Sequence, residues 1–172
     1  MRKISLTAIL ASVFFIFFVF YFSLKNEKTY DTTELIGKPL PENNLNIMGS
    51  ENLFNTQSLS KNDFTLINFW ASWCGPCRKE HKNLIHLSQK VNLKILGINF
   101  KDDLKKAKIF LDELGNPYYI LAFDKDGKKS INFGVYGIPE TILINSDLVI
   151  LKKYIGPIDI NDIKEIKKIT GR

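Results

Sequence analysis

The feature that most constrains this chain is a pair of cysteines placed between a strand-like run and a helix-like run. Residues 64–70 form a β-type apolar run, and Cys74-Gly75-Pro76-Cys77 follows shortly after it. Pro76 suits the first turn of a helix, where its missing N–H leaves no hydrogen bond unmade. We therefore predict that Cys74 lies at a helix N-terminus, where the dipole and unpaired N–H groups stabilise a thiolate and lower the thiol pKa. Cys74 and Cys77 are the predicted catalytic pair, with Cys77 the more shielded sulfur.

A closely spaced cysteine pair of this kind is typical of thiol–disulfide exchange, but it could also serve as a structural disulfide or as part of a zinc site. A purely structural disulfide would add little stability, because a bridge that closes so short a loop removes little chain entropy. A zinc site would draw on His81, which shares a helix face with Cys77, but His86 is turned well away and the tetrahedral set stays incomplete. We interpret both histidines as ordinary polar helix residues and expect no metal. Exchange chemistry is favoured, with the Cys74–Cys77 disulfide as the redox group and no other cofactor.

The second prominent feature is an apolar run near the N-terminus. Residues 4–24 carry no charged side chain, and this 21-residue length spans a bilayer as a helix. A cleaved signal peptide is the alternative, but no small-x-small cleavage site follows the run. Arg2 and Lys3 favour a cytoplasmic N-terminus. We therefore predict an uncleaved single-pass anchor over residues 1–24, with the rest of the chain outside the cytoplasm.

The remaining composition is that of one folded domain behind a short polar segment. Hydrophobic residues make up 45% of the 172 residues, and the formal net charge is +6. The basic residues are mostly lysines scattered among acids, which indicates a solvated surface and no nucleic-acid partner. Residues 25–36 are predicted to be a tether, and residues 37–172 a single domain.

Strand-like and helix-like segments alternate along this domain. We expect strands near 45–48, 64–70, 93–99 and 118–123, a hairpin of 141–144 with 148–154, and helices over 75–90, over 104–114 and at the C-terminus. Asp102 or Asp103 would cap the second helix, and residues 124–133 read as a polar, loop-like segment with room for a helical turn. A β-α-β unit followed by β-β-α predicts an α/β fold, with a central mixed β-sheet flanked by helices.

The order of elements and the Trp73–Cys77 string resemble the thioredoxin superfamily. The segments 70–81 and 134–141, the second reading Gly-Val-Tyr-Gly-Ile-Pro-Glu-Thr, are similar to the CcmG/DsbE type of cytochrome c maturation protein. The resemblance implies a thioredoxin-like oxidoreductase of the inner membrane whose domain faces the periplasm. It implies that the protein reduces disulfides of apocytochrome c or of a CcmH-like partner, with electrons from a DsbD/CcdA-like membrane reductant. Pro139 would be a cis-proline beside the disulfide.

One departure from general thioredoxins assigns a role to a glutamate. Those proteins carry a buried aspartate where this chain has Asn68, which cannot accept a proton. Glu80 lies on the predicted helix face of Cys77, one turn on, and is the candidate acceptor of the Cys77 proton. The alternative is an exposed or salt-bridged Glu80. Trp73 is predicted to be an exposed flank of the disulfide that contacts partners.

The string around Pro139 is predicted to bind the substrate. Proline lacks an N–H and leaves neighbouring backbone free to pair with an extended peptide. Tyr136, Ile138 and Glu140 are assigned to the edge of that groove; Tyr136 could instead pack, and Glu140 could be a solvated charge at a strand entry. A general ResA-like reductase and a redox-inert binding scaffold remain the alternative functions.

Overall fold

The computed structural model describes residues 6–25 and 33–172, and the chain divides into two units, residues 1–31 and residues 32–172. The first contains α1 (Leu6–Lys25), whose residues are all exposed, and within the described chain it is the one helix long and apolar enough to cross a membrane. The apolar helix predicted from the sequence is therefore present. Residues 1–5, at the start of the predicted anchor, and residues 26–32, most of the predicted tether, lie outside the described residues.

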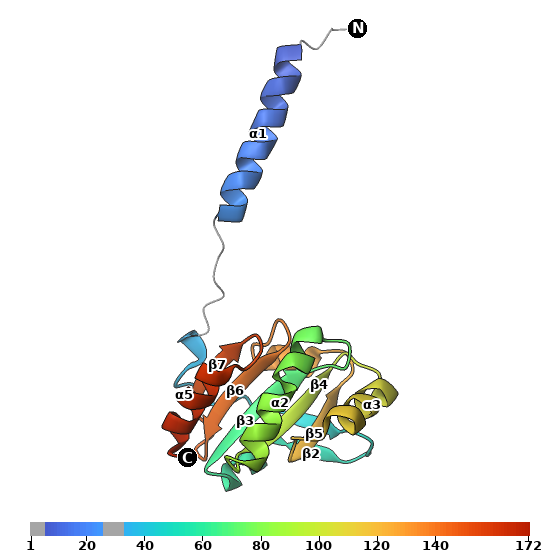
Figure 1. The fold of residues 1–172 in the computed structure, drawn as a ribbon, viewed down its shortest axis with the longest axis vertical. Helices are drawn as coiled ribbons and strands as arrows, with labels where there is room; N and C mark the ends of the chain where they lie inside the picture. Colours follow the sequence, from blue (N-terminus) through green and yellow to red (C-terminus); the bar gives the residue numbers. More distant parts are fainter. Residues whose placement is uncertain (1–5, 26–32) are drawn as a thin grey trace. The chain divides into compact units, whose positions relative to one another are not determined.

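The second unit is built on one seven-stranded mixed sheet (Figure 1), as predicted. The strands are β1 (Asn44–Ile47), β2 (Leu53–Asn55), β3 (Phe64–Trp70), β4 (Lys94–Phe100), β5 (Ile120–Asp124), β6 (Glu140–Asn145) and β7 (Ile150–Ile155), in the order β2-β1-β5-β4-β3-β6-β7. β3, β4 and β5 run parallel, and the other neighbours pair antiparallel. β3 has a partner on each side, so the cysteines follow an interior strand.

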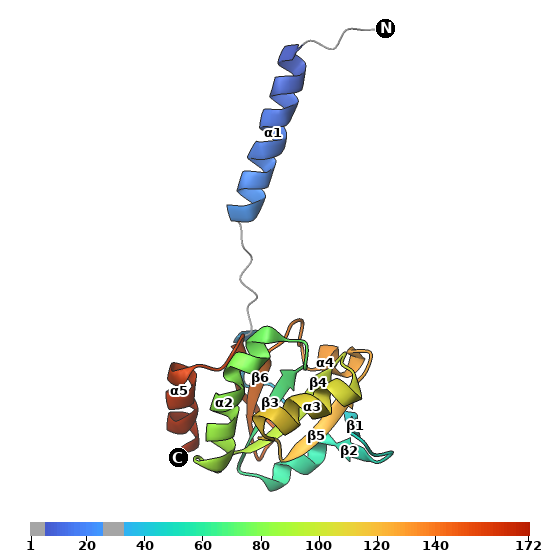
Figure 2. The same cartoon turned by 45° about the vertical axis from the view of Figure 1, so that its right-hand side comes forward.

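Helices and loops cover both faces of this sheet. The helices are α2 (Gly75–Gln89), α3 (Leu104–Leu114), α4 (Lys128–Asn132) and α5 (Ile160–Thr170), with 3-10 turns at Thr33–Leu35 and Thr56–Lys61. Figures 1 and 2 show α2 and α3 over the same face. Successive residues of β3 alternate between two buried clusters. Leu66 belongs to the cluster that includes residues of α2, α3 and α5, whereas Ile67 belongs to the cluster that includes Phe133 and Leu40, which precedes β1. Burial on both sides explains why β3 reads as a continuous apolar run.

Most predicted elements are confirmed, and the differences are local. Asp103, not Asp102, caps α3, because its carboxylate accepts the N–H groups of Lys105 and Lys106. α4 is the helical turn for which the loop-like segment 124–133 left room, and there Asp124 accepts the N–H and O–H of Ser130. The short β2 and the 3-10 turn after it were not expected, because three residues carry no readable periodicity.

Candidate active site

The cysteine pair stands at the start of α2, as predicted. Cys74 and Cys77 form a disulfide with an S–S distance of 2.04 Å. Cys74 is the N-cap residue of α2, its Sγ accepts the N–H of Cys77 at 3.1 Å, and Pro76 lies in the first turn. Cys74 is 4% exposed and Cys77 is 2% exposed. The predicted stronger shielding of Cys77 is therefore only a small difference in the disulfide form. A thiolate at the N-cap position would face the positive end of the helix dipole.

The loop that leads into the cysteines is tied to the start of α3. The N–H and O–H of Ser72 donate to the Asp102 carboxylate at 2.5 and 2.7 Å, and the Asn99 amide donates to the same carboxylate at 2.9 Å. Trp73 Nε1–H donates to the carbonyl of Lys101 at 3.0 Å, while 59% of the Trp73 surface stays exposed. The loop is therefore fixed, and Trp73 is the exposed flank that the sequence predicted. Asp102 was not recognised as a site residue, because a carboxylate before a helix reads as a cap.

The proline string lies at the same end of the sheet. The peptide bond between Ile138 and Pro139 is cis, as the resemblance implied. Glu140 begins β6 and pairs with Phe69 near the end of β3, so the buried Pro139 lies at the end where β3 leads to the cysteines. Tyr136 is 73% exposed, whereas Ile138 is half-buried against the core. Their assignment to substrate binding stays a prediction.

Glu80 is the centre of a buried hydrogen-bond network. It lies one turn after Cys77 on α2 and is 1% exposed, so the exposed alternative is wrong. The Asn68 amide donates to Glu80 Oε1 at 2.9 Å, and the backbone N–H of Ile158 donates to Oε2 at 2.8 Å. The Asn68 amide also donates to Thr141 Oγ1 at 3.0 Å. Both Glu80 oxygens thus meet neutral donors.

This environment gives Glu80 a pKa near neutrality. Burial raises the pKa of Glu80 from 4.5 to about 7, against the opposing effect of the hydrogen bonds from Ile158 and Asn68, and the charge of Asp162 adds slightly to the rise. Burial also raises the pKa of Tyr118 well above its usual range, so its O–H remains a donor, and it donates to Asn68 Oδ1 at 3.0 Å. That bond fixes which end of the Asn68 amide faces Glu80.

Glu140 is not the surface charge that either reading of the sequence assumed. It is 3% exposed, and its Oε2 lies 2.7 Å from Nζ of Lys153, which is also buried. Glu140 Oε1 accepts the N–H groups of Tyr136 and Gly137 at 3.1 and 2.9 Å, and Lys153 donates to the carbonyl of Gly134 at 2.6 Å. A buried carboxylate cannot edge a groove, so the pair instead positions the loop that presents Tyr136. Lys153 was not expected at the site from the sequence.

The prediction that both histidines are ordinary polar helix residues is wrong for His81. It is 2% exposed, its Nε2–H donates to the carbonyl of Gly115 at 2.8 Å, and its ring meets Phe110 edge to face at 5.0 Å. Burial lowers the pKa of His81, which keeps the ring neutral. His86 is exposed, as expected. Within residues 6–25 and 33–172, His, Cys, Asp and Glu side chains form no group of three that could hold a metal ion.

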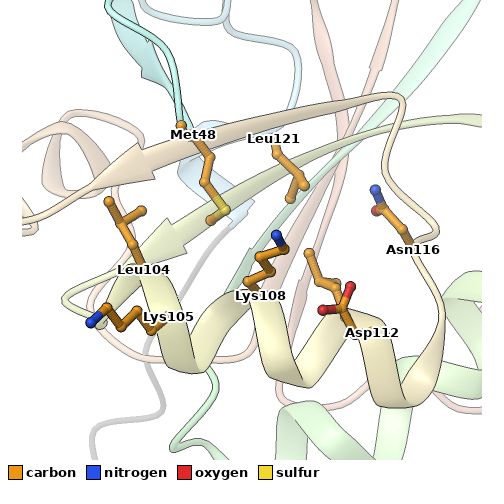
Figure 3. Close-up of a pocket in the computed structure, with 9 residues that line it drawn as sticks. Met48, Leu104, Lys105, Lys108, Asp112, Asn116 and Leu121 are labelled. Carbon is orange, nitrogen blue, oxygen red and sulfur yellow. The ribbon is translucent and has the colours of Figure 1, made fainter.

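An apolar pocket of about 450 Å³ lies against α3 (Figure 3). Figure 3 shows Leu104, Lys108 and Asp112 on α3 facing Met48 and Leu121. None of its lining residues belongs to the 70–78 segment or to the proline string. The pocket therefore takes no part in the arrangement around the disulfide.

The comparisons with known proteins agree with this geometry. A family model described as Redoxin matches residues 35–169. The chain is 40% identical over 139 residues to the thiol:disulfide interchange protein HelX of Rhodobacter capsulatus, covering 80% of this chain and 78% of that protein. It is 33% identical over 153 residues to DsbE of Allochromatium vinosum, covering 88% and 84%. A crystal structure of a putative DsbE from Chlorobium tepidum has the same fold, with a TM-score of 0.66 at 24% identity over 77% of this chain and 93% of that one.

Proposed function

The chain belongs to the Redoxin family as a thiol:disulfide interchange protein of the DsbE type, and on this premise we propose that it is a membrane-anchored, periplasmic reductant of protein disulfides that acts in cytochrome c maturation. The observation that carries the proposal is the Cys74–Cys77 disulfide at the N-terminus of α2, at the end of the sheet where the loop before Pro139 presents Tyr136. The disulfide itself is the redox group, and the chemistry needs no further cofactor.

The first step is attack by Cys74 on the disulfide of the partner. In the reduced protein, the Cys74 thiolate at the N-cap of α2 is stabilised by the helix dipole and by the N–H of Cys77. It attacks one partner sulfur and forms a mixed disulfide, and the other partner sulfur leaves as a thiolate. Pro139 has no N–H, which supports pairing of the backbone next to it with the extended partner chain.

The second step releases the partner. Cys77 loses its proton and attacks Cys74, so the intramolecular disulfide forms and the second partner sulfur leaves as a thiolate. Two electrons have then passed from the cysteine pair to the partner. Glu80 is the proposed acceptor of the Cys77 proton, because it lies one turn away in the same buried layer and has a pKa of about 7. A general base with a pKa near the working pH transfers protons most effectively.

The finer assignments rest on the family and on α1. The length and apolar composition of α1 support a single-pass inner-membrane anchor with the domain in the periplasm. Membership of the DsbE type supports apocytochrome c or a CcmH-like protein as the oxidised partner and a DsbD/CcdA-like membrane protein as the electron donor. The Gly75-Pro76 pair, common in reducing thioredoxins, supports the direction.

Trapping in the native membrane tests the proposal. Replacing Cys77 with serine removes the sulfur that resolves the mixed disulfide, so Cys74 should hold its partner covalently. We expect apocytochrome c or one assembly protein, seen as a shifted band that a reductant removes and identified by mass spectrometry. The Cys74→Ser variant is the control and should trap much less. Capture of many unrelated proteins would instead indicate a general ResA-like reductase, and no capture would contradict a redox role.

The same cells test the location of the domain. A membrane-impermeant maleimide added to spheroplasts should label Cys74 in the reduced Cys77→Ser variant before the membrane is lysed. Labelling only after lysis would place the domain in the cytoplasm and would overturn the periplasmic assignment.

A further inference from the structure

The backbone of Ile158 is held by two side chains of α2 that lie one turn apart. Its N–H donates to Glu80 Oε2 at 2.8 Å, and its carbonyl accepts the Asn83 amide at 2.7 Å. Asn83 follows Glu80 by three residues on the same helix, so both side chains face the segment between β7 and α5. The proposed function gives Asn83 no role, although its contact fixes the residue whose N–H reaches the proton acceptor.

The segment that carries Ile158 is anchored again two residues earlier. The N–H of Gly156 donates to the carbonyl of Pro139 at 2.9 Å. Gly156 has a φ of +86°, and among the described residues no atom beyond its chain neighbours lies within 4 Å of the position that a Cβ would take. Glycine is therefore required here for the path of the backbone and not for packing. Residues 156–158 thus link the proline of the partner-facing string to Glu80.

The same segment borders a route from Glu80 to water. A pocket of about 460 Å³ lies between α2 and residues 157–160, and Glu80, Asn83 and Ile158 are among its lining residues. Glu80 is 1% exposed, yet it lines this pocket, which opens to the surface beside the exposed Pro157. A proton accepted by Glu80 can therefore leave on this side of α2.

The other charged and titratable groups near Glu80 come from α2, from the start of α5 and from the segment before β5. Besides Cys77, one turn earlier on α2, they are Lys79, Lys82, Tyr118, Asp159 and Asp162. Replacing Asn83 changes none of these charges. A change in the titration of Glu80 on that replacement therefore reports on the Ile158 hydrogen bond.

We propose that Asn83 is a positioning residue for the proton-transfer step, which holds the N–H of Ile158 against Glu80 and so keeps this carboxylate ready to accept a proton. In that step the S–H bond of Cys77 breaks and an O–H bond forms on Glu80, and the proton later passes to water through the pocket. The inference rests on the proposed function, because that function makes Glu80 the acceptor. The Ile158 hydrogen bond favours the charged form of Glu80 and lowers its pKa, so a loosened Ile158 should raise it.

The titration of Glu80 tests the positioning role directly. Asn83→Ala frees the Ile158 carbonyl, so the segment can move and its N–H donates less well to Glu80. The full-length chain, oxidised and in detergent, is labelled with ¹³C at its glutamate carboxyls and followed by NMR as a function of pH; the Glu80 signal is the one that Glu80→Gln lacks. We expect the midpoint to rise by about one pH unit in Asn83→Ala, because a hydrogen bond to a charged group stabilises that form.

The resolving step gives a second measurement. Reduced protein joined through Cys74 to a chromogenic thiol releases that thiol when Cys77 attacks. We expect the pH profile of this release to move to higher pH in Asn83→Ala, together with the NMR midpoint. In Glu80→Gln the release should be slower and should lose this midpoint.

A second variant and two controls separate the segment from general stability. Gly156→Ala disturbs the segment from its other end, because alanine is strained at a positive φ, and should move the midpoint in the same direction. Asn132→Ala removes another asparagine amide, which donates to Asn43 Oδ1 at 3.1 Å, and Gly171→Ala places alanine at another positive φ, +68°. Both controls should keep the wild-type midpoint.

Three outcomes would overturn the inference. A wild-type midpoint in Asn83→Ala would remove the positioning role and leave Glu80 as the acceptor. Equal shifts in Asn83→Ala and the two controls would assign the effect to a general loss of stability. A wild-type rate and pH profile of thiol release in Glu80→Gln would remove Glu80 as the acceptor, and the role of Asn83 with it.

Discussion

Glu80 and Glu140 are both buried glutamates at the active end of the sheet, yet their surroundings differ in one respect. Glu80 receives an amide N–H from Asn68 and a backbone N–H from Ile158. Glu140 also receives two backbone N–H groups, but in addition it lies 2.7 Å from the ammonium of Lys153. Among residues 6–25 and 33–172, the Glu80 carboxylate is held by neutral dipoles, and the Glu140 carboxylate is held in addition by a full positive charge.

The difference assigns different work to the two residues. Burial among neutral donors brings the pKa of Glu80 to about 7, so the carboxyl can gain or lose a proton near neutral pH. With a cation, Glu140 forms a fixed ion pair whose remaining contacts bind the backbone at Gly134, Tyr136 and Gly137. We infer that Glu80 serves proton transfer and that Glu140 serves the shape of the partner-facing loop.

The largest expected effect comes from breaking the ion pair. Lys153→Met leaves the Glu140 carboxylate buried without its cation, and removal of one partner of a buried pair costs about 3–5 kcal/mol. The free energy of unfolding of the oxidised domain should fall by this amount in urea titrations at pH 7. The double variant Glu140→Gln with Lys153→Met should recover most of the loss. A loss below about 1 kcal/mol for Lys153→Met would show that the pair does not hold the loop.

The next effect is the pH dependence that Glu80 confers. Below about pH 4.5 the Glu80 carboxyl is protonated in both the folded and the unfolded protein. Between about pH 4.5 and 7 the folded protein keeps a proton that the unfolded protein releases, so the free energy of unfolding falls as pH rises. The total loss is up to about 3 kcal/mol, at 1.36 kcal/mol per pKa unit. Glu80→Gln should remove this slope from urea titrations, whereas Glu140→Gln should retain it. An unchanged slope in Glu80→Gln would assign the titration to another group.

The smallest effect concerns the residue that orients the Asn68 amide. Tyr118→Phe removes the O–H that donates to Asn68 Oδ1, and loss of one such hydrogen bond costs about 1 kcal/mol. The loss should be the same at every pH, because the Asn68 bond to Glu80 remains. Disappearance of the Glu80 slope in Tyr118→Phe would show that the amide has turned and that the tyrosine controls the proton site.

The sequence predicted the parts of the site that local rules determine. A proline two residues after Cys74 indicated the helix start, and the apolar face of that helix indicated where Glu80 would point. His81 follows Cys77 by four residues, which places it on the same helix face. Because that face is apolar, the spacing also predicts that His81 is buried, as the structure shows.

The parts that were missed depend on contacts between distant segments. Glu140 and Lys153 meet because β6 pairs with β7, and no local pattern states that two charges on neighbouring strands face each other inside the protein. One signal was present: Lys152 and Lys153 are adjacent in an apolar strand, and adjacent strand residues point to opposite faces of a sheet covered on both sides. Asp102 gave no such signal, because its partner Ser72 is 30 residues away.

The interior position of β3 has a consequence for the order in which the molecule opens. β3 is hydrogen-bonded along its length to β4 on one side and to β6 on the other. Backbone amides in such a strand exchange their hydrogens with solvent only when most of the domain unfolds, whereas edge strands and loops open at lower free energy. Cys74 lies four residues after the end of β3. The sulfur that meets the partner is therefore joined by a short loop to a strand whose amides we expect to exchange slowly.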